Sequence, residues 1–284
     1  MGTALLSITS ITTMVVQNCL FNNSCKTKLK TAKHINFFNI VVYSICVLIF
    51  GLLLLKEQFS LFTFLLGLLF GVVTALSNLF KMLSLSNGPM NLTLLVTTSS
   101  MIIPTMSGIF LGEAFSFAKL CIVLILIGFI YLAVSKSDDT KVSKKWFLFC
   151  LLAFSFQGTI GILQKIHQSS IHKTEVSGFL CVAFICAIIF CVIKNKGFSR
   201  EIQLDKSSVF IALICGGCTF GMNYINLKLS GALPSQLFFP LINGSAIVLS
   251  SLMSMIIFKE KLSKRQAVGL IGGIISLIAI CLVP

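Results

Sequence analysis

The residues best suited to bind a ligand are uncharged polar side chains that interrupt strongly apolar stretches. Gln17 and Gln164 lie toward the ends of two such stretches, and each carboxamide can both donate and accept hydrogen bonds. A solute bearing carboxylate, amine or hydroxyl groups would suit them. The alternative is hydrogen bonding between neighbouring helices, which is common and modest in energy. We include both glutamines in the predicted substrate cavity.

Other polar residues lie deeper in the apolar stretches. These residues could line a cavity. The alternative is that their hydroxyls bond only to carbonyls of their own helix, as often happens in membrane helices. Pro104 and Pro240 leave carbonyls without a donor, and we predict kinks that serve as gates; inert kinks are the alternative. The predicted cavity residues are Gln17, Asn78, Thr97, Thr98, Ser100, Gln164, Lys165, Asn223, Tyr224 and Asn243.

Charged residues near the ends of the apolar stretches have two interpretations. Lys81 and Lys228 could bind an anionic group, but a lysine within a turn of the interface can extend to the headgroups, which we favour. Lys165 has the same ambiguity. Glu113 and Glu260 are expected to stabilise helix ends rather than to bind solute. Because no stretch carries an acid near its centre, the obvious carboxylate for proton coupling is missing.

Signatures of catalysis or metal binding are missing from the sequence. We expect His34, His167 and His172 in loops, and no His-Glu-x-x-His, Gly-x-Ser-x-Gly or phosphate-binding loop occurs. Cys215 and Cys218 have the spacing of a metal pair, but no second pair completes a tetrahedral site. We therefore predict no enzymatic activity, no cofactor and no metal.

The elements that carry these residues must lie in a lipid bilayer. Hydrophobic residues make up 56% of the 284 positions, charged residues 11%, and the mean hydropathy is +1.01. A spanning helix needs about 20 mostly apolar residues. The net charge of +14 belongs to short connectors between apolar runs, which excludes nucleic-acid binding and favours contact with anionic lipid headgroups.

Ten apolar runs predict an all-α polytopic membrane protein with ten transmembrane helices. Most Lys and Arg residues follow the first, fifth, seventh and ninth runs, which predicts that these connectors are cytoplasmic and that both termini lie outside. The runs cover 2–21, 35–55, 60–83, 90–111, 117–135, 146–166, 176–193, 208–230, 234–258 and 265–283.

The ten runs divide into two similar halves. A polar linker, 136–145, separates residues 1–135 from 146–284. An odd number of spans in each half predicts two inverted five-helix repeats around a shared cavity near the midplane. A shift of 147 positions superimposes Gln17 on Gln164, Lys26 on Lys173, Thr27 on Thr174, Lys81 on Lys228, Glu113 on Glu260 and Ser116 on Ser263.

These features resemble the ten-helix, EamA-like branch of the drug/metabolite transporter superfamily. The resemblance rests on Gly112-Glu113 and Lys259-Glu260, each a charged break before a glycine-containing helix, and on Pro104 and Pro240 in the fourth and ninth spans. It implies two inverted bundles around a central cavity. The chain departs from the pattern in lacking a tryptophan early in the first span.

The predicted function is secondary transport of a small organic metabolite or drug by alternating access. The alternatives are a channel-like permease and a non-transporting membrane scaffold. We expect a multi-pass protein of the plasma membrane whose partners are a small-molecule solute and the lipid bilayer, with a homodimer left open. The substrate, its direction and its coupling are not specified by the sequence.

Overall fold

The computed structural model describes residues 2–29, 31–55, 59–88, 90–114, 116–133, 143–195, 204–258 and 264–283, and they are helical apart from short turns. The helices are α1 (Gly2–Thr27), α2 (Ala32–Leu54), α3 (Leu61–Asn87), α4 (Met90–Ser99), α5 (Ile102–Ser107), η1 (Gly108–Leu111), α6 (Phe117–Ala133), α7 (Lys144–Ser169), α8 (Val176–Lys194), α9 (Lys206–Ala232), α10 (Ser235–Phe239), η2 (Pro240–Gly244), α11 (Ser245–Phe258) and α12 (Lys264–Leu282).

Six of these helices are long and apolar enough to cross a membrane: α1, α2, α3, α7, α8 and α9. Four further apolar helical stretches are shorter, 96–111, 117–132, 235–250 and 267–282. The chain therefore has the all-helical, multi-pass character that its composition predicts. The predicted linker 136–145 lies largely outside the described residues, as does the break at Lys259-Glu260.

Two of the shorter stretches are interrupted beside their prolines. Pro104 has no N–H for the carbonyl of Ser100, and that carbonyl instead accepts from Ile103 N at 3.0 Å, which tightens the turn between α4 and α5. Pro240 begins the π-helical turn η2 between α10 and α11. Such turns are frequent at functional sites because they redirect the helix.

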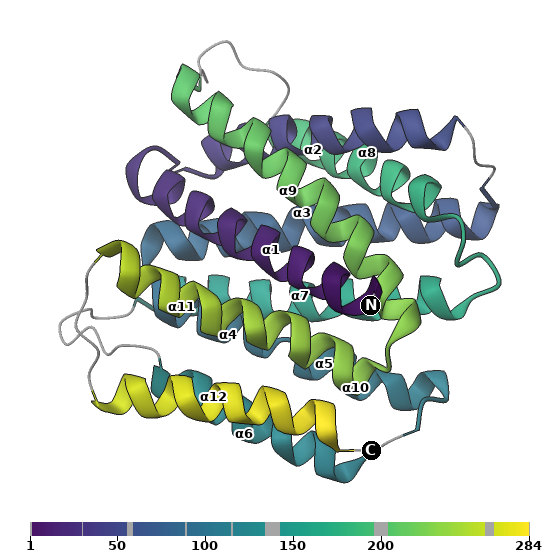
Figure 1. Ribbon diagram of the computed structural model, residues 1–284. Coiled ribbons are helices and arrows are strands. Elements are labelled where there is room, and N and C mark those ends of the chain that lie inside the picture. Colours follow the sequence, from purple (N-terminus) through teal and green to yellow (C-terminus); the bar gives the residue numbers. More distant parts are fainter. Residues whose placement is uncertain are drawn as a thin grey trace.

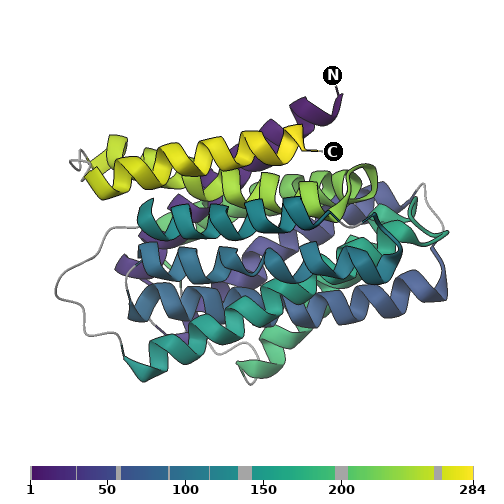
Figure 2. The same ribbon diagram turned by 90° about the horizontal axis from the view of Figure 1, so that it is seen from below.

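The helices lie side by side along one direction and reverse it at each connector (Figure 1). We call the end that carries the turns near residues 29 and 88 the inner end, and the end that carries those near residues 59 and 172 the outer end. Both termini lie at the outer end, on the right of Figure 1. The view in Figure 2, turned by 90°, shows the same arrangement from below.

The tightest packing joins helices from opposite halves of the chain. α2 packs against α8, α3 against α7 and α8, α9 against α1 and α2, and α6 against α12. The largest buried cluster, around Tyr43 and Phe184, lies within this interleaved set. The two halves therefore share one core.

Two histidines depart from their predicted place in loops. His34 lies in the first turn of α2, where its backbone N–H donates to the capping hydroxyl of Thr31. His167 lies in the last turn of α7, fully buried against the ring of Phe179. The sequence prediction assigned these polar residues to connectors because the helix extends beyond the end of the apolar run.

Candidate functional site

A cavity of about 80 Å³ lies among α1, α3, α5, α7, α9, α10 and η2, near the middle of the bundle. Its lining is rich in carboxamides, and none of the described residues that line it is charged. Most known pockets for drug-sized ligands measure roughly 300–1,000 Å³, so this one suits a small solute. The polar lining residues are Gln17, Thr74, Asn78, Ser100, Gln157, Gln164, Thr219, Asn223, Asn226 and Asn243.

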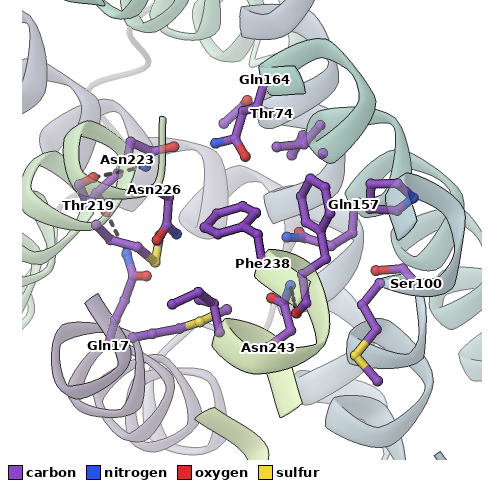
Figure 3. A pocket seen from close by; sticks show the side chains of 18 of the residues that line it. Gln17, Thr74, Ser100, Gln157, Gln164, Thr219, Asn223, Asn226, Phe238 and Asn243 are labelled. Atoms are coloured by element: carbon purple, nitrogen blue, oxygen red, sulfur yellow. Dashed lines mark hydrogen bonds between the residues drawn. The ribbon is translucent and has the colours of Figure 1, made fainter. Parts of the chain in front are cut away.

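One wall of the cavity is a polar network between α1 and α9. Gln17 Nε2 donates to Thr219 Oγ1 at 2.5 Å, and Asn223 Nδ2 donates to the carbonyl of Thr219 at 2.8 Å. Asn226 Oδ1 accepts a hydrogen bond from Ser10 Oγ. Figure 3 shows these side chains grouped on one side of Phe238. Each of the three carboxamides keeps further hydrogen-bonding capacity for a ligand.

The opposite wall comes from α3 and α7. Asn78 Nδ2 donates to Tyr43 Oη at 2.7 Å, and Ser77 Oγ donates to Gln157 Oε1 at 2.9 Å. The buried Thr74 hydroxyl, 6% exposed, lacks a hydrogen-bond partner among the described residues. Gln164, also 6% exposed, lines the cavity beside it. Buried polar groups normally find partners, so this wall is ready to bind a solute or water.

Close packing joins the cavity to the broken helices. A Cβ atom on Gly161 would lie 2.7 Å from the ring of Pro104 and 2.9 Å from Phe239 Cε1. Glycine at this position therefore lets α7 touch both the α4–α5 interruption and the start of η2. Movement of the helix at either proline would therefore displace the cavity wall that α7 forms.

The structure brings together part of the predicted set. Gln17, Asn78, Ser100, Gln164, Asn223 and Asn243 line the cavity, and Pro104 lines it as well. The other predicted residues, Thr97, Thr98, Lys165, Tyr224 and Pro240, are not part of that lining.

Two of the residues outside the lining make contacts elsewhere. Thr97 Oγ1 donates to the carbonyls of Thr93 and Leu94 within its own helix. Tyr224 packs on Phe220, and its ring carries the Lys228 ammonium at 4.3 Å. The Thr97 contact is the alternative stated from sequence, in which a hydroxyl bonds to carbonyls of its own helix.

Sequence reasoning missed Thr74, Gln157, Thr219 and Asn226. Their spacing held a signal: Thr74 and Asn78 lie four residues apart, Gln157 and Gln164 seven, and Thr219, Asn223 and Asn226 follow a similar step. Residues at those intervals share one face of a helix. Testing each polar residue for partners on the same face would have found them.

At the outer end, a buried ion pair closes the bundle beyond the cavity. Lys165 Nζ lies 2.5 Å from Glu113 Oε1, with exposed side-chain fractions of 6% and 21%. The same ammonium donates to the carbonyls of Ser230 and Leu233 at 2.7 and 2.9 Å. Glu113 Oε2 in turn accepts from Ser235 N at 2.7 Å. We call this junction of Glu113, Lys165, Ser230, Leu233 and Ser235 the outer latch.

The outer latch depends on a sharp turn after η1. Gly112 adopts φ 77°, a left-handed conformation that favours glycine, and it turns the chain so that Glu113 faces α7. Burial alone would raise the pKa of Glu113, but hydrogen bonds from Lys165 and Ser235 outweigh it and lower the pKa. The carboxylate is therefore ionised at neutral pH.

A pocket of about 790 Å³ lies on the outer side of this junction. Gln164 lines the cavity and its neighbour Lys165 lines the outer pocket; Gln236 lines the outer pocket while Phe238 lines the cavity. The two spaces are thus lined by neighbouring residues of α7 and of α10.

Other contacts tie the connectors together at each end. At the outer end, Glu175 accepts hydrogen bonds from Ser60 N at 2.8 Å and Ser60 Oγ at 2.9 Å, and contacts His172 Nδ1 at 2.7 Å. At the inner end, Lys28 pairs with Asp205, and Trp146 Nε1 donates to Thr93 Oγ1 at 2.9 Å.

The fold and the polar cavity define a multi-pass helical membrane protein with an internal solute-sized site. Residues 144–282 match the model of the EamA-like transporter family, so the resemblance drawn from the sequence is confirmed over this half of the chain.

Comparison with solved structures and curated proteins adds the fold alone. A structure titled "Crystal structure of protein" is similar over 99% of this chain and 96% of its own, with a TM-score of 0.75 and 12% sequence identity. No curated protein matches the chain.

Proposed function

We propose that the chain is a secondary carrier that moves a small organic solute through the central cavity by alternating access. The observation that carries this proposal is the position of the cavity. It is polar, it is built from helices of both halves, and on α7 and α10 its lining residues neighbour those of a larger pocket at the outer end. A carrier needs a site that can be closed on one side by a thin barrier.

An inverted repeat of ten spans is part of the proposal, and the helix contacts support it. The contact of α3 with α7 corresponds to that of α9 with α1 when the halves are exchanged, and the contact of α3 with α8 corresponds to that of α9 with α2. The contacts of α4 and α5 with α7 likewise correspond to that of α11 with α1. In an inverted repeat, exchanging the halves converts one access state into the other.

The outer latch would hold the carrier closed toward the outer side. Opening must separate Lys165 from Glu113 and move α10 with Phe238 away from α7, and the interruptions at Pro104 and Pro240 provide places to bend. We assign the inner end to the cytoplasmic side of the plasma membrane, because most of the basic connectors lie at that end.

Flux in vesicles tests the proposal. The purified chain, reconstituted into liposomes, should take up solutes from a panel of labelled small metabolites with saturable kinetics. Gln164→Ala should reduce uptake at least tenfold, whereas Gln168→Ala, four residues along the same helix and outside the cavity lining, should leave it unchanged. Unsaturable flux would indicate a channel, and no flux with any solute would favour a scaffold.

A further inference from the structure

Lys81 is a membrane-helix lysine without a matching acid. Its Nζ donates to Asn18 Oδ1 at 2.9 Å, and within the described ranges no carboxylate pairs with it. Other lysines differ: Lys165 pairs with Glu113, and the exposed Lys228 lies over the ring of Tyr224. The Lys81 ammonium therefore has a neutral partner within the protein.

The pair formed by Lys81 and Asn18 adjoins the central cavity. Asn78, which lines the cavity, lies one turn before Lys81 on α3, and Gln17, which also lines it, is the neighbour of Asn18 on α1. Residues three apart on a helix share a face. Neither Lys81 nor Asn18 is in the lining itself, and Lys81 follows Asn78 by about one turn of α3, toward the inner end. Asn18 itself is 6% exposed, which fixes the partner inside the protein.

An ammonium held by a single neutral amide in this setting is costly. Lys81 is partly exposed, but one carbonyl oxygen does not replace all the hydration that its ammonium loses beside Asn18, so an opposite charge nearby would stabilise it. The described lining of the cavity contains no acid that could serve. An anionic solute would supply the missing charge, and the carboxamides would donate to its remaining oxygens.

We propose that Lys81 and Asn18 form an anion-binding subsite at the inner side of the cavity, and that the transported solute is a small carboxylate. This inference rests on the proposed carrier function and specifies its substrate class. The cavity of about 80 Å³ favours a compact carboxylate over a phosphorylated metabolite. The positive inner end would also concentrate anions near the site.

Matched ligands test the charge preference directly. The full chain, purified in detergent, would be titrated with acetate, lactate, succinate, glutamate and benzoate, with the primary amide of each acid, with butylamine, and with inorganic phosphate, while thermal unfolding is followed. At least one carboxylate should raise the melting temperature saturably, and its amide should bind about tenfold more weakly or not at all. Tighter binding of the amides, of butylamine or of phosphate would overturn the proposal.

Variants identify the residue responsible. Lys81→Gln should weaken carboxylate binding about tenfold or more, Lys81→Arg should retain it, and Lys228→Gln, the equivalent position in the other half, should leave it unchanged. Asn18→Asp gives an independent test, because an acid at 2.9 Å from the ammonium would take the place of the solute's charge. It should abolish the preference for carboxylates, even if Lys81→Gln fails to fold.

The same variants separate this inference from the proposed function. Carboxylate binding that depends on Lys81, without flux in liposomes, would sustain the anion subsite and reject the carrier. Saturable flux of neutral or cationic solutes that survives Lys81→Gln would sustain the carrier and reject the subsite.

Discussion

The ammonium of Lys165 lies 2.5 Å from Glu113 Oε1 and reaches across the outer end from α7 to the turn after η1. The same two residues hold the connector between α9 and α10, through the carbonyl of Leu233 and the N–H of Ser235. Three segments from different parts of the chain thus meet at one ion pair. Breaking that pair should affect both the stability of the fold and the opening of the cavity.

Glu113→Gln should destabilise the protein and loosen the outer end. The substitution leaves Lys165 buried without its charged partner, and we expect a loss of about 2 kcal/mol in the free energy of unfolding. Thermal unfolding in detergent would measure it. An introduced cysteine at Ser230, which is fully buried, should react faster with a maleimide in the Glu113→Gln background because the outer end opens more often.

Lys119→Gln is the matched control for the outer latch. Lys119 lines the same outer pocket but forms no ion pair within the described chain. Its removal should change neither the melting temperature nor the labelling rate. Equal effects of Glu113→Gln and Lys119→Gln would mean that the local charge, and not the ion pair, sets the stability.

The lowered pKa of Glu175 predicts how the stability of the fold depends on pH. Burial would raise the pKa of Glu175, but hydrogen bonds from Ser60, Thr63 and His172 dominate and lower it from 4.5 to about 2. The folded state therefore binds this proton more weakly than the unfolded state does. Its contribution to stability is complete above pH 4.5 and is lost as the pH falls through about 2.

Glu175→Gln should remove this part of the acid sensitivity. The melting temperature of the variant should be lower than that of the unchanged protein at neutral pH, and the two should converge between pH 4.5 and about 2. Melting curves across that range would show it. Parallel curves, separated by a constant interval, would indicate that the carboxylate does not drive the pH dependence.

How much the sequence could predict differs between the fold and the site. The apolar runs located the helices because burial in lipid demands long hydrophobic stretches, and amides such as Gln17 and Asn223 stood out against them. The sequence could not show that Lys165 turns outward to Glu113 while its neighbour Gln164 faces the cavity. That choice depends on where α10 packs, and pairing between distant segments leaves no local pattern.

The two equivalent glutamines should behave differently. Gln17 Nε2 donates to Thr219 Oγ1 at 2.5 Å, whereas Gln164 lines the cavity on α7. Gln17→Ala should therefore cost about 1 kcal/mol of stability through the lost hydrogen bond, and Thr219→Val should cost a similar amount. Gln164→Ala should reduce solute binding without changing the melting temperature. Equal destabilisation by both glutamine substitutions would show that Gln164 is also structural.

Gly161→Ala tests whether α7 must touch the broken helices. The added methyl group would lie 2.7 Å from the ring of Pro104, so α7 must shift or α5 must bend further, at a cost of about 1–3 kcal/mol. We expect a lower melting temperature and slower transport. Gly221→Ala is the matched control, because nothing lies within 4 Å of a Cβ atom at that position of α9. Alanine favours helix over glycine by about 0.5–1 kcal/mol, so this variant should be neutral or slightly more stable. If both substitutions left melting and transport unchanged, the contact between Gly161 and Pro104 would have no part in the motion of the carrier.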